Sequence, residues 1–362
     1  MPVERKDEVA RLLRQRLEAL RQRDGDLWSR RPRGRDSWGV PPPPSPSPDE
    51  EGLRREWLRR GRGRPLEDLL GPGTTRAGPD LWRVEETRDF PSPRGRPEAL
   101  RRRLGRLLEA VPGIRDRTAA RLRQAGVEDL EALRDHPRFG HHARTLTRHQ
   151  DRGDAAWLTR RLARRLGPSA PLLAAVPLLG DPGDLCALDL ETGGLFGGSP
   201  IVVAGTARLC DNGVRVVQWV VSGPDGEPAL VEALAREMDR TGVILTFNGR
   251  SFDWPCLCGR AAYWGRPWPF DPAHLDLLPP ARRAFRAAAS DARLSTLARE
   301  VLGRNRAEDL PGSWVPRLYQ EYLRDPAEAG GLLAAIAWHN RLDVLDTMAL
   351  WVALVERAEE AP

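Results

Sequence analysis

Residues 185–247 read LCALDLETGGLFGGSPIVVAGTARLCDNGVRVVQWVVSGPDGEPALVEALAREMDRTGVILTF and set the order of elements. Apolar runs joined by short turns predict three strands of an antiparallel meander, at 185–192, 200–208 and 214–222. A helical stretch at about 226–240 leads to a fourth strand at 242–247. Because this strand is reached through a helix, the order βββαβ predicts an α/β fold with a mixed sheet.

Composition divides the whole chain into six segments. The acidic segment 183–358 adds to the strands a short helix near 252–264, an extended HLDLL at 274–278 and further helices, and we expect one domain there. A basic, mostly helical N-terminal region precedes it. Its expected parts are an arginine-rich helix at 1–23, a disordered Pro/Ser-rich linker at 24–52, a small β element at 53–98, a helical region at 99–167 and a connector at 168–182.

Length and composition exclude several classes of protein. The 362 residues suggest two or three domains. No apolar run reaches the roughly 20 residues of a membrane helix, and the charged start of the chain is unlike a signal peptide, so we expect no membrane partner. The four cysteines form neither a disulfide framework nor a zinc site, which predicts buried free thiols in a reducing, cytoplasmic protein. We also expect no small-molecule cofactor.

Charge is distributed unevenly along the chain. Residues 1–180 hold 39 basic and 26 acidic side chains, whereas residues 181–362 hold 18 and 25. Nearly all the basic residues are arginine, which biased base composition explains, but that bias does not explain the difference between the halves. We therefore expect the basic half to bind a polyanion, DNA or RNA, and the acidic half to hold cations.

Residues 107–137, LLEAVPGIRDRTAARLRQAGVEDLEALRDHP, have the pattern of short helices around a tight turn. The segment resembles a helix-hairpin-helix unit, a module that binds nucleic-acid backbone without reading its sequence. A glycine turn at Gly113 lets backbone N–H groups approach a phosphate. The surrounding positive charge comes from Arg115, Arg117, Arg121 and Arg123. The alternative is an ordinary helical hairpin with a solvated arginine face.

Two acids end the first strand of the C-terminal domain. Asp189 and Glu191 are two residues apart, so their side chains point to the same face of the sheet. They lie at the carboxyl end of a strand, where open α/β sheets tend to bind ligands. Two carboxylates on one face repel each other unless a cation lies between them, and hard oxygen ligands suit Mg²⁺ or Mn²⁺. A pair of solvated acids is the alternative.

Two later segments carry further acids. In TFNGRSFDWPCL (246–257), Asp253 sits in an apolar context, and Asn248 leaves the strand, where it either serves the site or ties a loop. In AIAWHNRLDVLDTMALW (335–351), His339 and Asp343 are four residues apart and share one face of a helix. The recurrence of acids in three elements favours one shared site over three solvated surfaces.

The motifs D-x-E, N-x-x-x-F-D and H-x-x-x-D resemble those of the DEDD exonuclease superfamily. Over about 183–357, the segments LDLETGGL, TFNGRSFDWPCL, HLDLL, RLSTLAREVLG, DLPGSWVPRLYQEYL and HNRLDVL are similar to the bacterial YprB-type ribonuclease H-like domain. The preceding stretch GPGTTRAGPDLWRVEET (71–87) also resembles that family. The resemblance implies a ribonuclease H-like fold and a divalent-metal-dependent 3′–5′ exonuclease. By motif position it implies four metal-binding acids, with His339 positioning the attacking water: Asp189, Glu191, Asp253 and Asp343.

One spacing departs from the pattern that the resemblance implies, in which a histidine usually stands five residues before the last aspartate and a tyrosine four residues before it. Here His339 stands four residues before Asp343. In a two-metal mechanism, the cations stabilise the entering and leaving oxygens, and a histidine can accept the proton of the water. Asn248, His274 and Asp276 are candidate supporting residues near the metal site, with a purely structural role as the alternative. Arg282, Arg283, Arg304 and Arg306 either contact substrate phosphates or form a solvated surface.

Two other functions stay open. One is a non-catalytic nucleic-acid-binding or scaffold protein that keeps the fold, although the presence of all four acids argues against it. The other is a structure-specific endonuclease on the same fold. Helicase and polymerase activities are excluded because the chain has no GxxxxGK[ST] loop and no room for a polymerase domain. Degradation of end-labelled DNA and RNA with Mg²⁺ or Mn²⁺, alongside Asp189→Ala, would discriminate between these functions.

Overall fold

The computed structural model describes residues 47–194 and 198–360. The expected helix at 1–23 and most of the expected linker at 24–52 lie outside the described residues. The last part of that linker is helical instead, because α2 (Pro48–Gly61) begins there. Ser47 and Glu50 form a capping box that satisfies the first backbone N–H groups of α2. The end of the Pro/Ser-rich stretch therefore supplies the N-cap of a helix.

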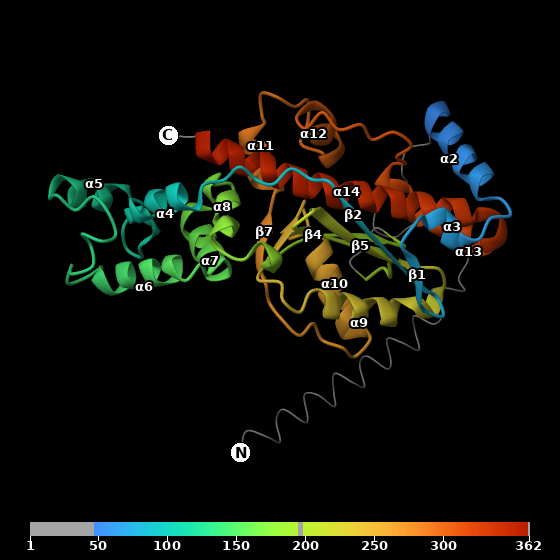
Figure 1. The fold of residues 1–362 in the computed structure, drawn as a ribbon, viewed down its shortest axis with the longest axis horizontal. Helices are drawn as coiled ribbons and strands as arrows, with labels where there is room; N and C mark the ends of the chain where they lie inside the picture. Colours follow the sequence, from blue (N-terminus) through green and yellow to red (C-terminus); the bar gives the residue numbers. More distant parts are fainter. Residues whose placement is uncertain (1–46, 195–197, 361–362) are drawn as a thin grey trace, which may run out of the picture.

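A seven-stranded mixed sheet forms the centre of the molecule, in the order β1-β2-β5-β4-β3-β6-β7 (Figure 1). The antiparallel meander consists of β3 (Leu185–Thr192), β4 (Ile201–Cys210) and β5 (Gly213–Val221). Two shorter strands, β6 (Val243–Thr246) and β7 (Ala273–Asp276), run parallel to β3 on its other side. The α/β fold and the βββαβ order expected from the sequence are confirmed.

The strands expected within 53–98 are present, but the stretch also contains helices, and its strands belong to the main sheet. That stretch contains α2, the short helix α3 (Leu66–Leu70) and a hairpin of β1 (Thr74–Gly78) and β2 (Leu81–Arg88). Strand β2 pairs with β5 along its whole length, from Leu81 opposite Val221 to Arg88 opposite Val214. The hairpin therefore extends the main sheet, because the outer edge of β5 offers it a ladder of backbone hydrogen bonds.

Helices cover both faces of the sheet. Helices α9 (Glu227–Glu237) and α10 (Asp253–Tyr263) pack on one face, and the 35-residue α14 (Pro326–Glu360) crosses the other (Figure 1). Strand alternation produces this division, because Leu188 points toward α10 while Ala187 points toward α14. The connection between β7 and α14 contains α11 (Leu278–Ala284), α12 (Leu294–Glu300) and α13 (Val315–Arg324).

The basic helical region lies at one end of the sheet (Figure 1). It contains α4 (Pro97–Gly105), α5 (Asp116–Gln124), α6 (Gly140–Asp151), α7 (Ala155–Leu166) and α8 (Leu172–Ala175). Its buried leucines share one core with the C-terminal half of α14, where Trp351 Nε1 donates to Ala174 O at 2.8 Å. This region is therefore packed against the sheet domain rather than tethered to it.

All four cysteines are free, as expected, but only two are buried. Cys186 and Cys256 lie in the core and Cys258 is partly exposed. Cys210 is exposed because it ends β4 beyond the packed part of the sheet, so the expectation of a buried thiol is wrong there. Among residues 47–194 and 198–360, no helix has the length and hydropathy needed to cross a membrane.

Candidate functional site

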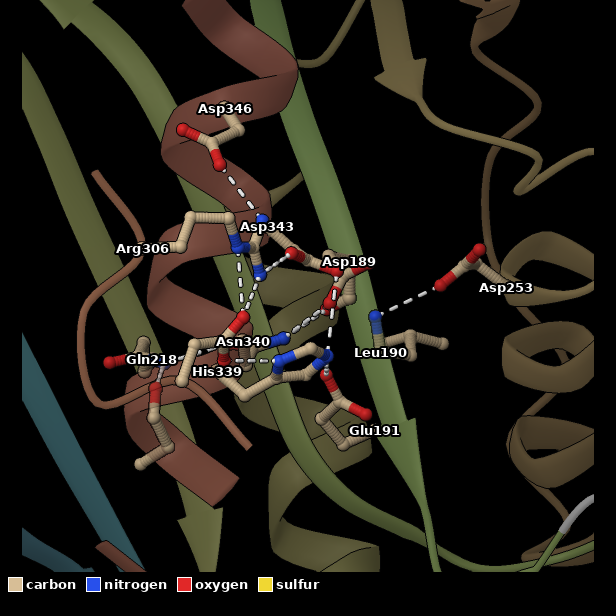
Figure 2. Close-up of polar contacts among 12 residues, drawn as sticks. Asp189, Leu190, Glu191, Gln218, Asp253, Arg306, His339, Asn340, Asp343 and Asp346 are labelled. Carbon is tan, nitrogen blue, oxygen red and sulfur yellow. Dashed lines mark hydrogen bonds and ion pairs between the residues drawn. The ribbon is translucent and has the colours of Figure 1, made fainter. Parts of the chain in front are cut away.

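The carboxyl end of β3 presents Asp189 and Glu191 to α14 (Figure 2). Asp189 Oδ2 accepts a hydrogen bond from Asn340 Nδ2 at 2.8 Å, and Glu191 Oε1 lies 3.8 Å from His339 Nε2. Glu191 is 8% exposed, and Asp189 is more accessible. The period-two alternation of the strand thus places both acids on one face, as the sequence predicts.

Helix α14 supplies the facing residues His339, Asn340 and Asp343. Asp343 Oδ2 lies 3.7 Å from His339 Nε2, one helical turn away. Sequence reasoning missed Asn340, which is fully buried and bonded through Nδ2 to both the backbone and the side chain of Asp189. Its Oδ1 accepts from Gln218 Nε2 at 2.8 Å. Gln218 was the one sign of this network in the sequence, because it is a polar residue inside the apolar strand VRVVQWVV.

Asp253 begins α10 and points at β3 from the other side (Figure 2). Its side chain is 5% exposed, and its Oδ1 accepts from the backbone N–H of Leu190 at 2.9 Å. That N–H is available because the ladder between β3 and β6 ends at Ala187. The structure therefore brings Asp189, Glu191 and Asp343 around His339, while Asp253 binds the backbone of the strand between the first two acids.

The segment between α12 and α13 brings two arginines and an aspartate to the acids of α14, a position that the sequence did not indicate. Arg306 donates to Asp343 Oδ1 at 2.5 Å, to Asp346 Oδ2 at 2.8 Å and to Asp309 Oδ2 at 2.8 Å. Arg304 donates to Asp346 Oδ1 at 2.5 Å. The sequence left these arginines as either phosphate contacts or solvated surface residues; in the structure their guanidinium groups pair with acids of the protein itself.

Burial and mutual repulsion perturb the acids on β3 and α10. Burial, followed by the neighbouring Glu191 and Asp343 carboxylates, raises the pKa of Asp189 well above its usual value. Burial raises the pKa of Glu191 to about 8, an effect that the His339 ring opposes. Burial also raises the pKa of Asp253 to about 7, against the opposing hydrogen bond from Leu190.

The pKa of His339 is raised, whereas burial alone would lower the pKa of a histidine. Burial lowers the pKa of its ring, but the carboxylates of Asp343, Glu191 and Asp309 outweigh burial and raise that pKa to about 10. The closest of these acids is Asp309, whose Oδ1 lies 2.6 Å from His339 Nδ1. Asp309 is a second residue that sequence reasoning missed, because it lies in a loop without a periodic pattern.

The donor chemistry of the site fits a divalent cation, because the acids offer only hard oxygen ligands with raised pKa values. Their orientation does not yet form a metal site. Within the described ranges, no three His, Cys, Asp or Glu side chains are grouped so as to hold an ion. Two of the acids have other partners: Arg306 donates to Asp343, and the Leu190 N–H donates to Asp253.

The expected supporting residues lie around the neighbouring turn. Asp276 accepts from the backbone N–H groups of Asn248 at 2.8 Å, Arg250 at 3.2 Å and Leu278 at 3.0 Å. His274 Nε2 lies 2.7 Å from Thr246 Oγ1. These contacts tie the ends of β6 and β7 together. Arg282 and Arg283 are exposed on α11, and their contact with a substrate stays a prediction.

The turn at the start of α5 has the conformation that its glycine predicts. Gly113 has φ +83°, and Arg165 from α7 donates to the carbonyls of Val111 at 3.2 Å and Ile114 at 2.8 Å. Arg115, Arg117 and Arg121 are exposed, whereas Arg123 pairs with Glu109 at 2.9 Å. A nucleic-acid-binding role for these residues stays a prediction.

Comparison with known proteins agrees with the sheet topology. Residues 186–355 match the family described as RNase_H superfamily. The chain is 34% identical over 178 residues to the uncharacterized protein YprB of Bacillus subtilis (strain 168), a match that covers 48% of this chain and 42% of that relative. This chain thus aligns with less than half of the relative's length.

A solved structure is also similar to part of the chain. It is the family B DNA polymerase from the hyperthermophilic archaeon Pyrobaculum calidifontis, at 23% identity and a TM-score of 0.36. The similarity covers 46% of this chain and 24% of the polymerase.

Proposed function

We propose that the protein is a divalent-metal-dependent nuclease, on the premise that residues 186–355 match the RNase_H superfamily and are similar to part of YprB. The reaction is hydrolysis of phosphodiester bonds, in the 3′–5′ exonucleolytic direction and with two Mg²⁺ or Mn²⁺ ions. The substrate is DNA or RNA.

One observation carries this proposal: three elements from distant parts of the sequence bring carboxylates to the same end of β3. Asp189 and Glu191 come from the strand, Asp253 from the start of α10 and Asp343 from α14. Several carboxylates close together at a partly buried position destabilise the protein unless they bind a ligand of opposite charge. A cation is the ligand that the all-oxygen donor set fits.

Asp189, Glu191, Asp253 and Asp343 would hold the metal ions. When bound, such ions polarise the phosphate and lower the pKa of water. Asn340 keeps the Asp189 carboxylate turned toward α14 through its hydrogen bond to Oδ2. His339 places Nε2 between Glu191 and Asp343, where the ring would position an attacking water.

The exposed arginines of α5 would hold the substrate backbone. Among the residues that the structure describes, these arginines form no ion pair, unlike Arg123, and the turn at Gly113 exposes the start of the helix. Contact with phosphates without base contacts predicts binding that does not depend on sequence and that weakens with salt.

The test is degradation of end-labelled DNA and RNA by the full chain with Mg²⁺ or Mn²⁺. We expect shortening from the 3′ end, abolished by Asp189→Asn. A matched control is Asp184→Asn, which removes the same charge just before β3, at the strand's opposite end. If both variants lose activity, or if neither does, the assignment of Asp189 to the active site is wrong. Internal cleavage would instead indicate an endonuclease.

A second candidate follows from the ion pair between Arg306 and Asp343, because a guanidinium already neutralises one of the four acids. In that case the domain binds nucleic acid without hydrolysing it. Equilibrium binding in the presence of Mg²⁺, together with no product after extended incubation, would support this second function over the first.

A further inference from the structure

Asp309 is the loop residue that contacts His339. Its two carboxylate oxygens have different partners: Oδ1 lies 2.6 Å from His339 Nδ1, and Oδ2 accepts from Arg306 Nε at 2.8 Å. The Asp309 and His339 side chains are 11% and 12% exposed. Because both oxygens are engaged, the carboxylate cannot turn without losing a charged hydrogen bond.

This contact determines which ring nitrogen is engaged and which one faces the acids of the site. The pKa of Asp309 is lowered, since the His339 and Arg306 contacts outweigh its burial, so the group is an ionised acceptor. His339 Nδ1 must then carry the shared proton. The second nitrogen, Nε2, lies 3.8 Å from Glu191 Oε1 and 3.7 Å from Asp343 Oδ2, which are too long for hydrogen bonds. It therefore faces the acids without being bound by either.

The loop itself is held in place from two sides. Toward the site, a Cβ on Gly312 would stand 2.7 Å from His339 Nε2, so glycine permits the close approach of the backbone. On the outer side, Arg60 of α2 pairs with Glu308 at 2.7 Å, and Trp57 Nε1 donates to Glu308 O at 3.0 Å. Asp309 is thus presented by a braced segment rather than by a free loop.

We propose that Asp309 is a positioning residue for His339. It fixes the ring with Nδ1 as donor and Nε2 directed between Glu191 and Asp343. This inference rests on the proposed nuclease function for its purpose, but the orientation of the ring is a property of the metal-free protein and can be measured without turnover.

The first measurement is the NMR signal of the His339 ring N–H in the metal-free full chain, assigned by its loss in His339→Ala. We expect a downfield-shifted, slowly exchanging Nδ1 proton that is lost in Asp309→Asn. The matched control is Asp346→Asn, which removes a buried carboxylate from the same Arg306 network without contacting His339. A signal that survives in Asp309→Asn, or disappears equally in Asp346→Asn, would overturn the proposal.

The second measurement is a double-mutant cycle on nuclease turnover. We expect Asp309→Asn to lower kcat by roughly 10-fold to 100-fold, in the range found for residues that orient a site histidine, with little change in KM. In the His339→Ala background the same substitution should have no further effect. Additive losses would show that Asp309 does not act through His339. A wild-type protein without turnover would refute the proposed function alone, and the NMR result would still decide the positioning role.

Discussion

Ionisation of Asp189 lowers the stability of the metal-free protein, and the same carboxylate would bind a metal ion. Burial and two neighbouring carboxylates raise its pKa, so ionisation at neutral pH opposes folding. We expect Asp189→Asn to raise the free energy of unfolding of the metal-free protein, because asparagine has no ionised form for burial and the neighbouring carboxylates to oppose. Asparagine can still accept the hydrogen bond from Asn340.

Thermal unfolding with and without Mg²⁺ checks this expectation. The ion should raise the midpoint for the wild type and for Asp184→Asn, but not for Asp189→Asn, because a ligand stabilises only the fold that binds it. A variant that melts below the wild type, or that responds to Mg²⁺ to the same extent, would be incompatible with a charged metal site at Asp189.

His274 gives a separate pH dependence of stability. Burial lowers the pKa of its ring to about 4, whereas an unfolded histidine titrates near 6.5. Between these values the unfolded chain binds a proton that the folded chain does not, so stability falls as the pH decreases from about 6.5 to 4. In His274→Gln this loss, up to about 3 kcal/mol, should be absent.

Urea unfolding of wild type and His274→Gln at a series of pH values measures the difference directly. The same substitution at the exposed His141 is the control. If the difference between wild type and His274→Gln does not change with pH, the ring is not buried in its neutral form.

At the scale of elements, the sheet domain includes β2, which pairs with β5. Leu81 is 1% exposed and packs in the same core as Leu188 and Val217. We expect Leu81→Ala to cost about 2–5 kcal/mol in the unfolding of the sheet domain, as for other large-to-small core substitutions. Thr75→Ala on the exposed edge strand β1 should change it by less than about 0.5 kcal/mol. An unchanged unfolding transition in Leu81→Ala would mean that the hairpin folds separately.

Elements with a local signal were predictable, and those defined by distant partners were not. Apolar runs and Gly turns located β3, β4, β5 and β6 to within two residues. The pairing of β2 with β5 has no local signal, because the two strands are more than 100 residues apart. The site divides in the same way: motif spacing indicated the acids and His339, whereas Asp309 and Arg306 reach it from a loop whose position only the fold determines.

At the scale of the whole molecule, α14 connects the basic and acidic halves. Its central turns carry His339 and Asp343, and its C-terminal half packs with α7 and α8 in one core. Removing the N-terminal half would therefore expose this core and also remove β1 and β2. The contribution of the basic region to binding is better tested by surface substitutions that leave the core intact.

The last prediction concerns the arginines on α5. Replacing Arg115, Arg117 and Arg121 together by glutamine should weaken binding to duplex DNA and reduce the slope of log K against log salt by up to about 3, since each phosphate contact contributes about 0.9. Turnover of a short oligonucleotide at saturating concentration should be retained, because the candidate site is untouched. The control variant carries the same charge change at exposed arginines of the other half, Arg236, Arg240 and Arg324. Equal affinities and equal salt slopes for the two variants, measured by titration at several salt concentrations, would assign the basic helices to another partner.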